Sequence, residues 1–327
     1  MTVIDVHTHM LTREYLVFLE DKGRDTFVCR PSAAGQPTIY REGVPFFTLT
    51  PQMFDYDLRI ADMDRAGVDV AIVSLTCPNA FFGDEAISSQ AARMVNDSMA
   101  EQCRLRPHRI QWFASLPWQF EKAALAELRY ARANGAVGVF VTANIDNLSL
   151  TDVAFDGIWS EIDRLRMPVL VHPTTPMGFH QMQLNELGLV PTAGFMIDTT
   201  LALTRMILSG FFDRFQNLKI IAAHGGGTLP YIIGRLDRAH ETLPIVSSVI
   251  KDKPSSYVER IYFDAVVYAE PALRLCVEVC GDDNVMFGSD YPHNLGDMRG
   301  CLERVDSLPV AVKAKVRGSN ARRIFGL

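Results

Sequence analysis

The chain has 327 residues, which exceeds the ~250 at which a single hydrophobic core usually stops growing, so it forms either two modest domains or one large α/β barrel. Hydrophobic residues make up 48% of the sequence and charged residues 21%, a composition that excludes disordered and fibrous chains. The formal net charge of -6 offers no basic face to a polyanion, so we expect no nucleic-acid partner.

The amino terminus, MTVIDVHTHM, has neither the basic region nor the apolar run of a signal peptide, and no uncharged apolar stretch of ~18 residues follows it. The six cysteines include no CxxC motif and lie mostly in apolar periodic segments, which is typical of core residues in a reducing compartment. The sequence therefore predicts a cytoplasmic protein without a membrane span or a disulfide framework.

Short apolar runs bounded by turn residues alternate with segments of helical period along the chain. Eight such runs are expected to be strands, at residues 3–6, 70–75, 110–116, 136–141, 168–172, 218–223, 261–265 and 284–289. The intervening segments predict helices at residues 84–104, 121–134, 154–166, 197–212, 229–240, 272–280 and 310–325. Eight strand-helix units favour a (β/α)8 TIM barrel of the α/β class, because a doubly wound sheet of eight strands more often splits into sub-domains.

Residues 11–56 depart from this alternation, since they carry aromatic residues, prolines and glycines without a clear period. We expect this segment to be an insertion after the first strand that lies over the barrel mouth. No linker or low-complexity run interrupts the chain, which predicts a single domain over residues 1–327.

Histidines and an aspartate stand at the carboxyl ends of the predicted strands, where the side chains of a barrel converge. His7 and His9 end the first strand, His172 ends the fifth, and His224 and Asp290 follow the sixth and eighth. A single histidine near an apolar strand is more often a hydrogen-bonded core residue, so the evidence for a metal site lies in the whole set. Imidazoles with one carboxylate suit Zn²⁺, and Mn²⁺, Fe²⁺ or Co²⁺ can use the same ligands.

The motifs around these residues resemble the amidohydrolase superfamily: HxH at 7–9, LVHP at 170–173, AHGGG at 223–227 and GSDYP at 288–292. Within it the chain is most similar to the decarboxylase subgroup typified by 2-amino-3-carboxymuconate-6-semialdehyde decarboxylase, and the similarity extends to the terminal GSNARRIFGL. The resemblance implies that His7, His9, His172 and Asp290 bind one Zn²⁺ per subunit, and that His224 is an acid or base that does not bind the metal. Binuclear members use a lysine at the end of the fourth strand, where this chain has Thr142, so we expect a single metal.

A bound divalent ion can support hydrolysis, hydration or decarboxylation, because it lowers the pKa of its water and polarises substrate oxygens. The resemblance favours a metal-dependent non-oxidative decarboxylase of a carboxylated aromatic (an ortho-hydroxy or ortho-amino acid) or of a carboxymuconate-semialdehyde-type substrate. In the resembling enzymes, either the metal-bound water adds to the substrate before carbon dioxide leaves, or the metal chelates a phenolate and carboxylate pair. In the second case the resemblance gives Asp290 a further, catalytic role as proton donor to the ring carbon. The alternative is a metal-dependent hydrolase or hydratase of a lactone, amide or enol acid. A purely structural metal is disfavoured, because these ligands leave a coordination position open.

Three further residues are expected to contact the substrate, a small carboxylic acid. The resemblance places Arg235 where it reaches into the neighbouring subunit's site, which implies a homodimer; the alternative is a surface arginine paired with Asp237. Phe47 stands where the subgroup has a second carboxylate-binding arginine, so we expect an apolar substrate with one carboxylate. His293 replaces an aromatic residue of the subgroup and is expected to touch the pocket.

Two other arginines are candidates to replace the missing cation at residue 47, namely Arg41 and Arg59. Arg59 is expected instead to pair along its own helix with Asp62. The three glycines that follow His224 leave backbone N–H groups at a helix start, which favours an anionic oxygen nearby, although such a run is more often only a tight turn.

Overall fold

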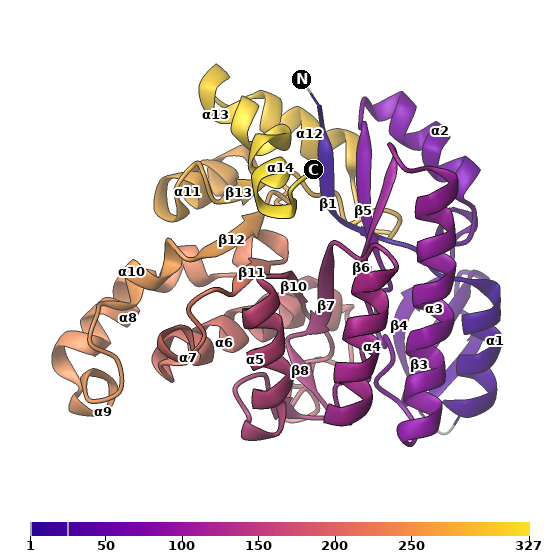
Figure 1. Ribbon diagram of the computed structural model, residues 1–327, viewed down its shortest axis with the longest axis horizontal. Helices are drawn as coiled ribbons and strands as arrows, with labels where there is room; N and C mark the ends of the chain where they lie inside the picture. Colours follow the sequence, from indigo (N-terminus) through magenta and orange to yellow (C-terminus); the bar gives the residue numbers. More distant parts are fainter. Residues whose placement is uncertain (1, 25) are drawn as a thin grey trace.

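A closed barrel of eight parallel strands forms the centre of the computed structural model, which describes residues 2–24 and 26–327 (Figure 1). The strands follow one another around the barrel as β1 (Ile4–His9), β5 (Val70–Ser74), β6 (Ile110–Ala114), β7 (Gly138–Thr142), β10 (Pro168–His172), β11 (Lys219–Ala222), β12 (Ile261–Asp264) and β13 (Val285–Met286). The ring closes where the Val6 amide donates to the Phe287 carbonyl at 3.0 Å, beside β13. The predicted (β/α)8 barrel is confirmed.

Helices cover the outside of the barrel after each strand, as the sequence pattern predicts. The main ones are α2 (Tyr56–Ala66), α3 (Glu85–Leu105), α4 (Glu121–Ala133), α5 (Asp156–Leu165), α6 (Phe195–Leu208), α8 (Leu229–Thr242), α11 (Glu270–Cys280), α12 (Met298–Asp306) and α14 (Asn320–Phe325). The predicted helix 197–212 is interrupted at Gly210, whose φ of 69° is left-handed, and it resumes as α7 (Phe211–Arg214). The predicted helix 310–325 is likewise split into α13 (Val310–Ala314), a π-helical turn and α14.

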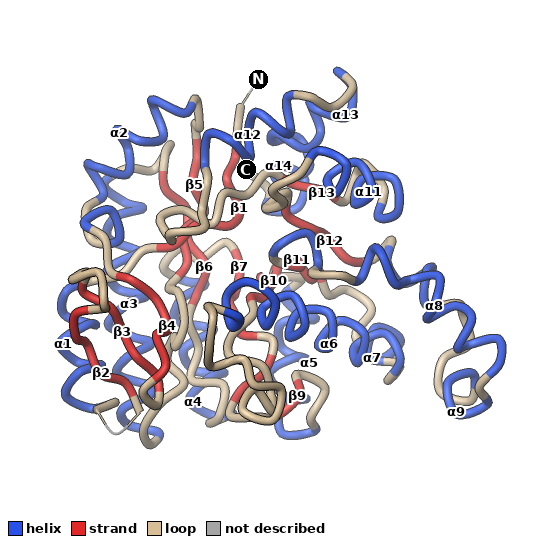
Figure 2. Tube along the Cα trace, turned by 180° about the vertical axis from the view of Figure 1, so that it is seen from behind, coloured by secondary structure: helices blue, strands red, loops and turns tan. Residues whose placement is uncertain are grey.

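Residues 11–56 are more regular than the sequence indicated. They form α1 (Arg13–Lys22) and a small antiparallel sheet of β2 (Phe27–Pro31), β3 (Pro37–Arg41) and β4 (Val44–Thr48), which lies beside the barrel in Figure 2. Glu42 and Gly43 both have positive φ and link β3 to β4, as in a type I′ hairpin. Strands of five residues are too short to show a period beside so many aromatic residues, which is why the sequence did not reveal this sheet.

The interior of the barrel is filled by inward-facing apolar side chains from several strands, including Ile4 and Val6 of β1, Phe140 of β7 and Leu170 of β10. Simple alternation from Ile4 and Val6 would turn His7 and His9 to the opposite face. The pairing with β5 shifts register between Asp5 and Thr8, which places one extra residue in β1. This β-bulge reverses which residues of β1 face inward from that point on. It therefore brings both histidines to the site at the carboxyl end of the strand.

The segment from α8 through α9 (Pro244–Ser247) to α10 (Pro254–Val258) projects from the barrel as an arm, at the lower left of Figure 1. Across the described residues, no helix combines the length and the apolar character needed to cross a membrane.

Candidate metal centre

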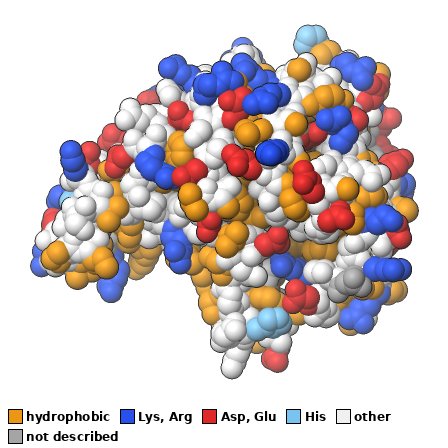
Figure 3. Space-filling view, turned by 60° about the horizontal axis from the view of Figure 1, so that its bottom comes forward, with side chains coloured by type: hydrophobic (Ala, Val, Ile, Leu, Met, Phe, Trp, Pro, Cys, Tyr) orange, Lys and Arg blue, Asp and Glu red, His pale blue; other side chains and the backbone are white. Residues whose placement is uncertain are grey.

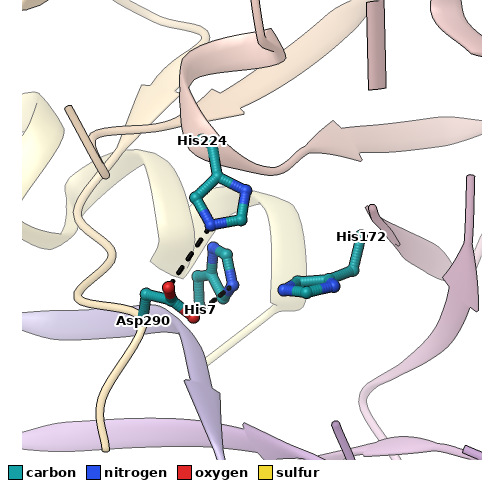
Figure 4. A group of neighbouring side chains, drawn as sticks. All are labelled: His7, His172, His224 and Asp290. Atoms are coloured by element: carbon teal, nitrogen blue, oxygen red, sulfur yellow. Dashed lines mark hydrogen bonds and ion pairs between the residues drawn. The ribbon is translucent and has the colours of Figure 1, made fainter. Parts of the chain in front are cut away.

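The five residues singled out at the strand ends lie together in the structure, and Figure 4 shows four of them, His7, His172, His224 and Asp290. The Nε2 atoms of His7 and His9 are 3.2 Å apart, and Asp290 Oδ1 lies 3.4 Å from His7 Nε2 and 3.2 Å from His9 Nε2. The ring centroids of His172 and His224 lie 5.0 and 4.9 Å from that of His7. One nitrogen of His172 and one of His224 also fall within 4.8 Å of the ligand atoms of His7 and Asp290.

This group has the properties of a site for a cation. His172 Nε2 and Asp290 Oδ1 are buried and lack a hydrogen-bond partner within the described residues, although buried polar atoms are almost always paired. The two facing Nε2 atoms of His7 and His9 can share at most one proton in a hydrogen bond. A divalent ion would satisfy all of these lone pairs, and three imidazoles with one carboxylate suit Zn²⁺ or Mn²⁺.

The second ring nitrogen of each candidate ligand is engaged by a neighbouring oxygen, as is usual for metal-binding histidines. His7 Nδ1 lies 2.5 Å from Asp264 Oδ2, His9 Nδ1 lies 3.0 Å from Ser74 Oγ, and His172 Nδ1 lies 2.7 Å from the Pro173 carbonyl. These contacts fix the orientation of the rings and leave each Nε2 directed at the centre.

Asp264, at the end of β12, is an important residue of this site that the sequence analysis missed. Its carboxylate is fully buried and accepts the backbone N–H groups of His224 and Gly225, each at 3.0 Å, in addition to the His7 ring. The sequence did carry a signal for it, because Asp264 stands at the end of one predicted strand in the same way that Asp290 follows the last one. The single carboxylate thus connects the candidate ligand His7 on β1 to the turn that carries His224.

Burial and the neighbouring carboxylates set the charges of the site. Burial alone would lower the pKa of His7, but Asp264 and Asp290 raise it to about 10. Burial lowers the pKa of His9 to about 3 and holds the pKa of His172 well below its usual value. For Asp290, burial alone would raise the pKa, but the neighbouring imidazoles of His224, His7 and His9 keep it well below the ordinary range. Asp290 is therefore an ionised carboxylate. His9 and His172 are neutral imidazoles, each with a nitrogen lone pair that can bind a metal ion.

His224 lies at the edge of the centre and also lines the adjacent cavity. Its Nε2 is 3.4 Å from Asp290 Oδ2, and its Nδ1 is buried without a hydrogen-bond partner among the described residues. Gly225 and Gly226 follow with positive φ, and a Cβ on Gly226 would lie 2.6 Å from the Phe263 ring. This turn requires glycine for its shape.

The expectation that the three glycines offer free N–H groups to an anion is wrong. Their amides donate to Asp264, to the Ala223 carbonyl and to the His224 carbonyl, so they hold the turn together.

A cavity of about 810 Å³ opens from the metal centre between β4, the segment before α6 and the segment after β12. Phe47 and His293 both line it, with their rings 5.8 Å apart. His293 lies 5.0 Å from His9, and its Nε2 is 2.8 Å from Thr76 Oγ1. Phe195 lies on another side of the centre, 6.1 Å from His172. Arg235, by contrast, is exposed on α8 and does not line this cavity.

Arg59 does not pair with Asp62, contrary to expectation, and it does not reach the cavity. Its guanidinium is fully buried and donates to Thr8 Oγ1 at 2.6 Å and to the His9 carbonyl at 2.5 Å, below the Tyr291 ring. The Tyr291 hydroxyl donates to Asp62 instead. Arg59 is thus a structural residue whose hydrogen bonds hold the end of β1, which carries His9, in place.

Comparison with known proteins agrees with this architecture. Residues 4–327 match the family model described as amidohydrolase. The 2-amino-3-carboxymuconate-6-semialdehyde decarboxylase of Dictyostelium discoideum is 30% identical over 99% of this chain and 91% of its own length. The crystal structure of 5-carboxyvanillate decarboxylase from Sphingomonas paucimobilis superimposes with a TM-score of 0.87 at 26% identity, over 100% of this chain and 99% of that one.

A 5-carboxyvanillate decarboxylase from Novosphingobium aromaticivorans, solved with manganese and 4-hydroxy-3-methoxy-5-nitrobenzoic acid, superimposes with a TM-score of 0.84 at 25% identity. That similarity covers 100% of this chain and 96% of the other. The family match and these full-length similarities establish that the chain belongs to the amidohydrolase family.

Proposed function

We propose that this protein is a metal-dependent non-oxidative decarboxylase, a carbon-carbon lyase that acts on a carboxylated aromatic acid. The observation that carries the proposal is the open ring of Nε2 and carboxylate atoms at the inner end of a largely apolar cavity, with His224 beside it. The named relatives are decarboxylases, which favours this activity over the hydrolase or hydratase alternative.

His7, His9, His172 and Asp290 would hold one divalent ion per subunit. Their nitrogen and oxygen donors support Zn²⁺, and the manganese in the Novosphingobium relative makes Mn²⁺ the alternative. When bound, such an ion polarises the carboxylate and the ortho oxygen of a substrate.

Phe47, 5.8 Å from His293, and Phe195, 6.1 Å from His172, both line the cavity beside the centre and would contact a flat ring bound there. Loss of carbon dioxide breaks the bond between the ring carbon and the carboxylate, and the electron pair left on that carbon must receive a proton. Asp290 is placed to donate this proton once it carries one. His224, 3.4 Å from Asp290 Oδ2 and open to the cavity, is placed to supply Asp290 with a proton from solvent.

The projecting arm supports a homodimer in which Arg235 serves the partner's site. Tyr231, Ile245 and Val249 on this arm are 81%, 79% and 53% exposed, and Figure 3 shows hydrophobic side chains on the underside of this end of the molecule, at the left. Exposed apolar groups of this size are typical of an interaction surface. Arg235 lies on the same helix, α8, and in a dimer it would supply the cation for the single substrate carboxylate.

The cellular location is proposed from the cysteines. All six are free thiols in the structure, which supports a reducing compartment such as the cytoplasm.

The activity is tested by incubating metal-replete protein with a panel of ortho-hydroxy and ortho-amino aromatic acids and carboxymuconate-type acids. Release of carbon dioxide and ultraviolet spectra are followed together, with metal-stripped protein as the control. We expect stoichiometric carbon dioxide release with at least one aromatic acid. If no compound of the panel releases carbon dioxide while one metal per subunit is still bound, the proposal is contradicted. Lactones and enol acids would then be tested as substrates of a hydrolase or hydratase.

A further inference from the structure

The cavity is larger than a simple hydroxybenzoate requires. Ligand cavities of about 300–1,000 Å³ typically enclose drug-sized molecules, and this one measures about 810 Å³. A monocyclic acid held at the metal centre between Phe47 and Phe195 would leave much of that volume to water.

The chemistry of the walls changes from the inner end to the outer end. At the inner end lie His172, His224, Asp290 and His293. Most of the other lining side chains are apolar and come from β4 and from the segment before α6, among them Val44, Phe46, Leu184, Val190 and Pro191. The polar groups among them are neutral hydroxyls and amides, such as those of Thr192, Asn185 and Asn294.

Apart from Asp290 and the two histidines at the metal centre and His293 beside it, the described lining residues carry two ionisable groups, the Tyr268 phenol and the Cys77 thiol, and no cation. Burial raises the pKa of both, so both are neutral. Phe46, Leu184 and Val190 are each less than 10% exposed although they border this space. Such a wall stabilises an apolar ligand group and would leave a second carboxylate unpaired.

We infer that the natural substrate is a 2-hydroxybenzoate or 2-aminobenzoate that carries an alkyl or similar apolar substituent on the ring edge opposite the carboxylate. This inference rests on the proposed function, because it places the carboxylate and the ortho oxygen or nitrogen at the metal centre. Ring positions 4 and 5 then face outward, and the substituent lies against Phe46, Leu184 and Val190.

The inference is tested with metal-replete protein and a series of 2-hydroxybenzoates bearing hydrogen, methyl, ethyl or propyl at position 4 or 5. Burying one methylene contributes about 0.8 kcal/mol, so kcat/KM is expected to rise about fourfold per carbon in at least one of the two series. A chain of similar length that ends in a carboxylate serves as the polar control and should give no gain. Activity on the parent compound with flat or falling kcat/KM along both series would overturn the inference and leave the proposed function intact.

A variant locates the substituent within the cavity. Val190→Phe should reduce the ratio of kcat/KM for the propyl and parent compounds toward one, because the added ring fills the space against the buried wall. Val153→Phe is the matched control, since Val153 is 78% exposed and lies outside the cavity. An unchanged ratio in a folded Val190→Phe protein would place the substituent elsewhere and overturn the assignment to this wall.

If no compound in this series is decarboxylated, the proposed function is judged on the wider panel of acids, and binding of the 3- and 4-alkylphenols tests the cavity independently of it. Calorimetric titration of the wild-type protein should then show Kd falling about fourfold per methylene in one of the two series. A Kd independent of chain length in both would overturn the inference as well.

Discussion

Asp264→Asn is expected to weaken metal binding without touching a metal ligand. The Asp264 carboxylate accepts four hydrogen bonds: Oδ2 receives the His7 ring and the His224 amide, and Oδ1 receives the Gly225 and Val266 amides. In the asparagine variant one oxygen becomes an NH2 group that faces two donors.

The size of the effect follows from these contacts. Hydrogen bonds to a charged acceptor contribute about 1.5–3 kcal/mol each, so the loss of two should lower the free energy of unfolding by about 3–6 kcal/mol. The His7 ring also loses the negative charge that orients it, and the loss of such a partner typically costs about 10–100-fold in metal affinity. The folded variant should therefore bind metal about 10–100-fold more weakly than the wild type.

Metal affinity is measured by competition with a chelator at defined free Zn²⁺, and metal content by elemental analysis. The control is Asp198→Asn, because Asp198 is also buried but accepts from Asn144 and the Thr174 amide and makes no hydrogen bond to a candidate metal ligand among the described residues. It should lose stability and keep wild-type metal affinity. A folded Asp264→Asn protein with wild-type affinity would refute the role assigned to this carboxylate.

Four further outcomes are expected from the same structure. Arg59→Met should lower the free energy of unfolding in urea by about 3–5 kcal/mol, because buried acceptors on β1 lose their donor, whereas the exposed Arg65→Ala should change it by less than about 1 kcal/mol. His224→Ala should keep one equivalent of metal and lose about 10²-fold or more in kcat, and normal turnover would reject its role as acid or base. Phe47→Arg should raise kcat/KM about tenfold for substrates with a second carboxylate relative to apolar ones, and an unchanged ratio would remove Phe47 from the substrate contacts. Mixing subunits that carry Arg235→Ala with subunits whose metal site is disabled should restore partial activity, and mixed dimers without activity would show that each site is self-contained.

Periodicity was sufficient to predict the barrel because each strand and helix repeats its pattern of burial. The eight predicted apolar runs correspond to the eight barrel strands, and the longest predicted helix, 84–104, corresponds to α3. The small sheet β2–β4 was not predicted, because its strands are short and their burial does not alternate regularly.

Strand ends also indicated which residues would meet, since parallel strands in a barrel bring their carboxyl ends together. His7, His9, His172, His224 and Asp290 were all named from their position in the sequence, and the structure places them within a few ångströms of one another.

The kind of fold and the chemical groups at its centre could be predicted from the amino-acid sequence alone, because both depend on local order along the chain. Which side chains of β1 face the site depends on the folded structure, because a β-bulge, and not simple alternation, turns His7 and His9 toward it. The folded structure also decided the roles of Asp264 and Arg59, whose partners lie 257 and 50 residues away along the chain. Contacts at such separations leave no periodic signal in one sequence, so only the folded chain reveals which buried charge supports which ligand.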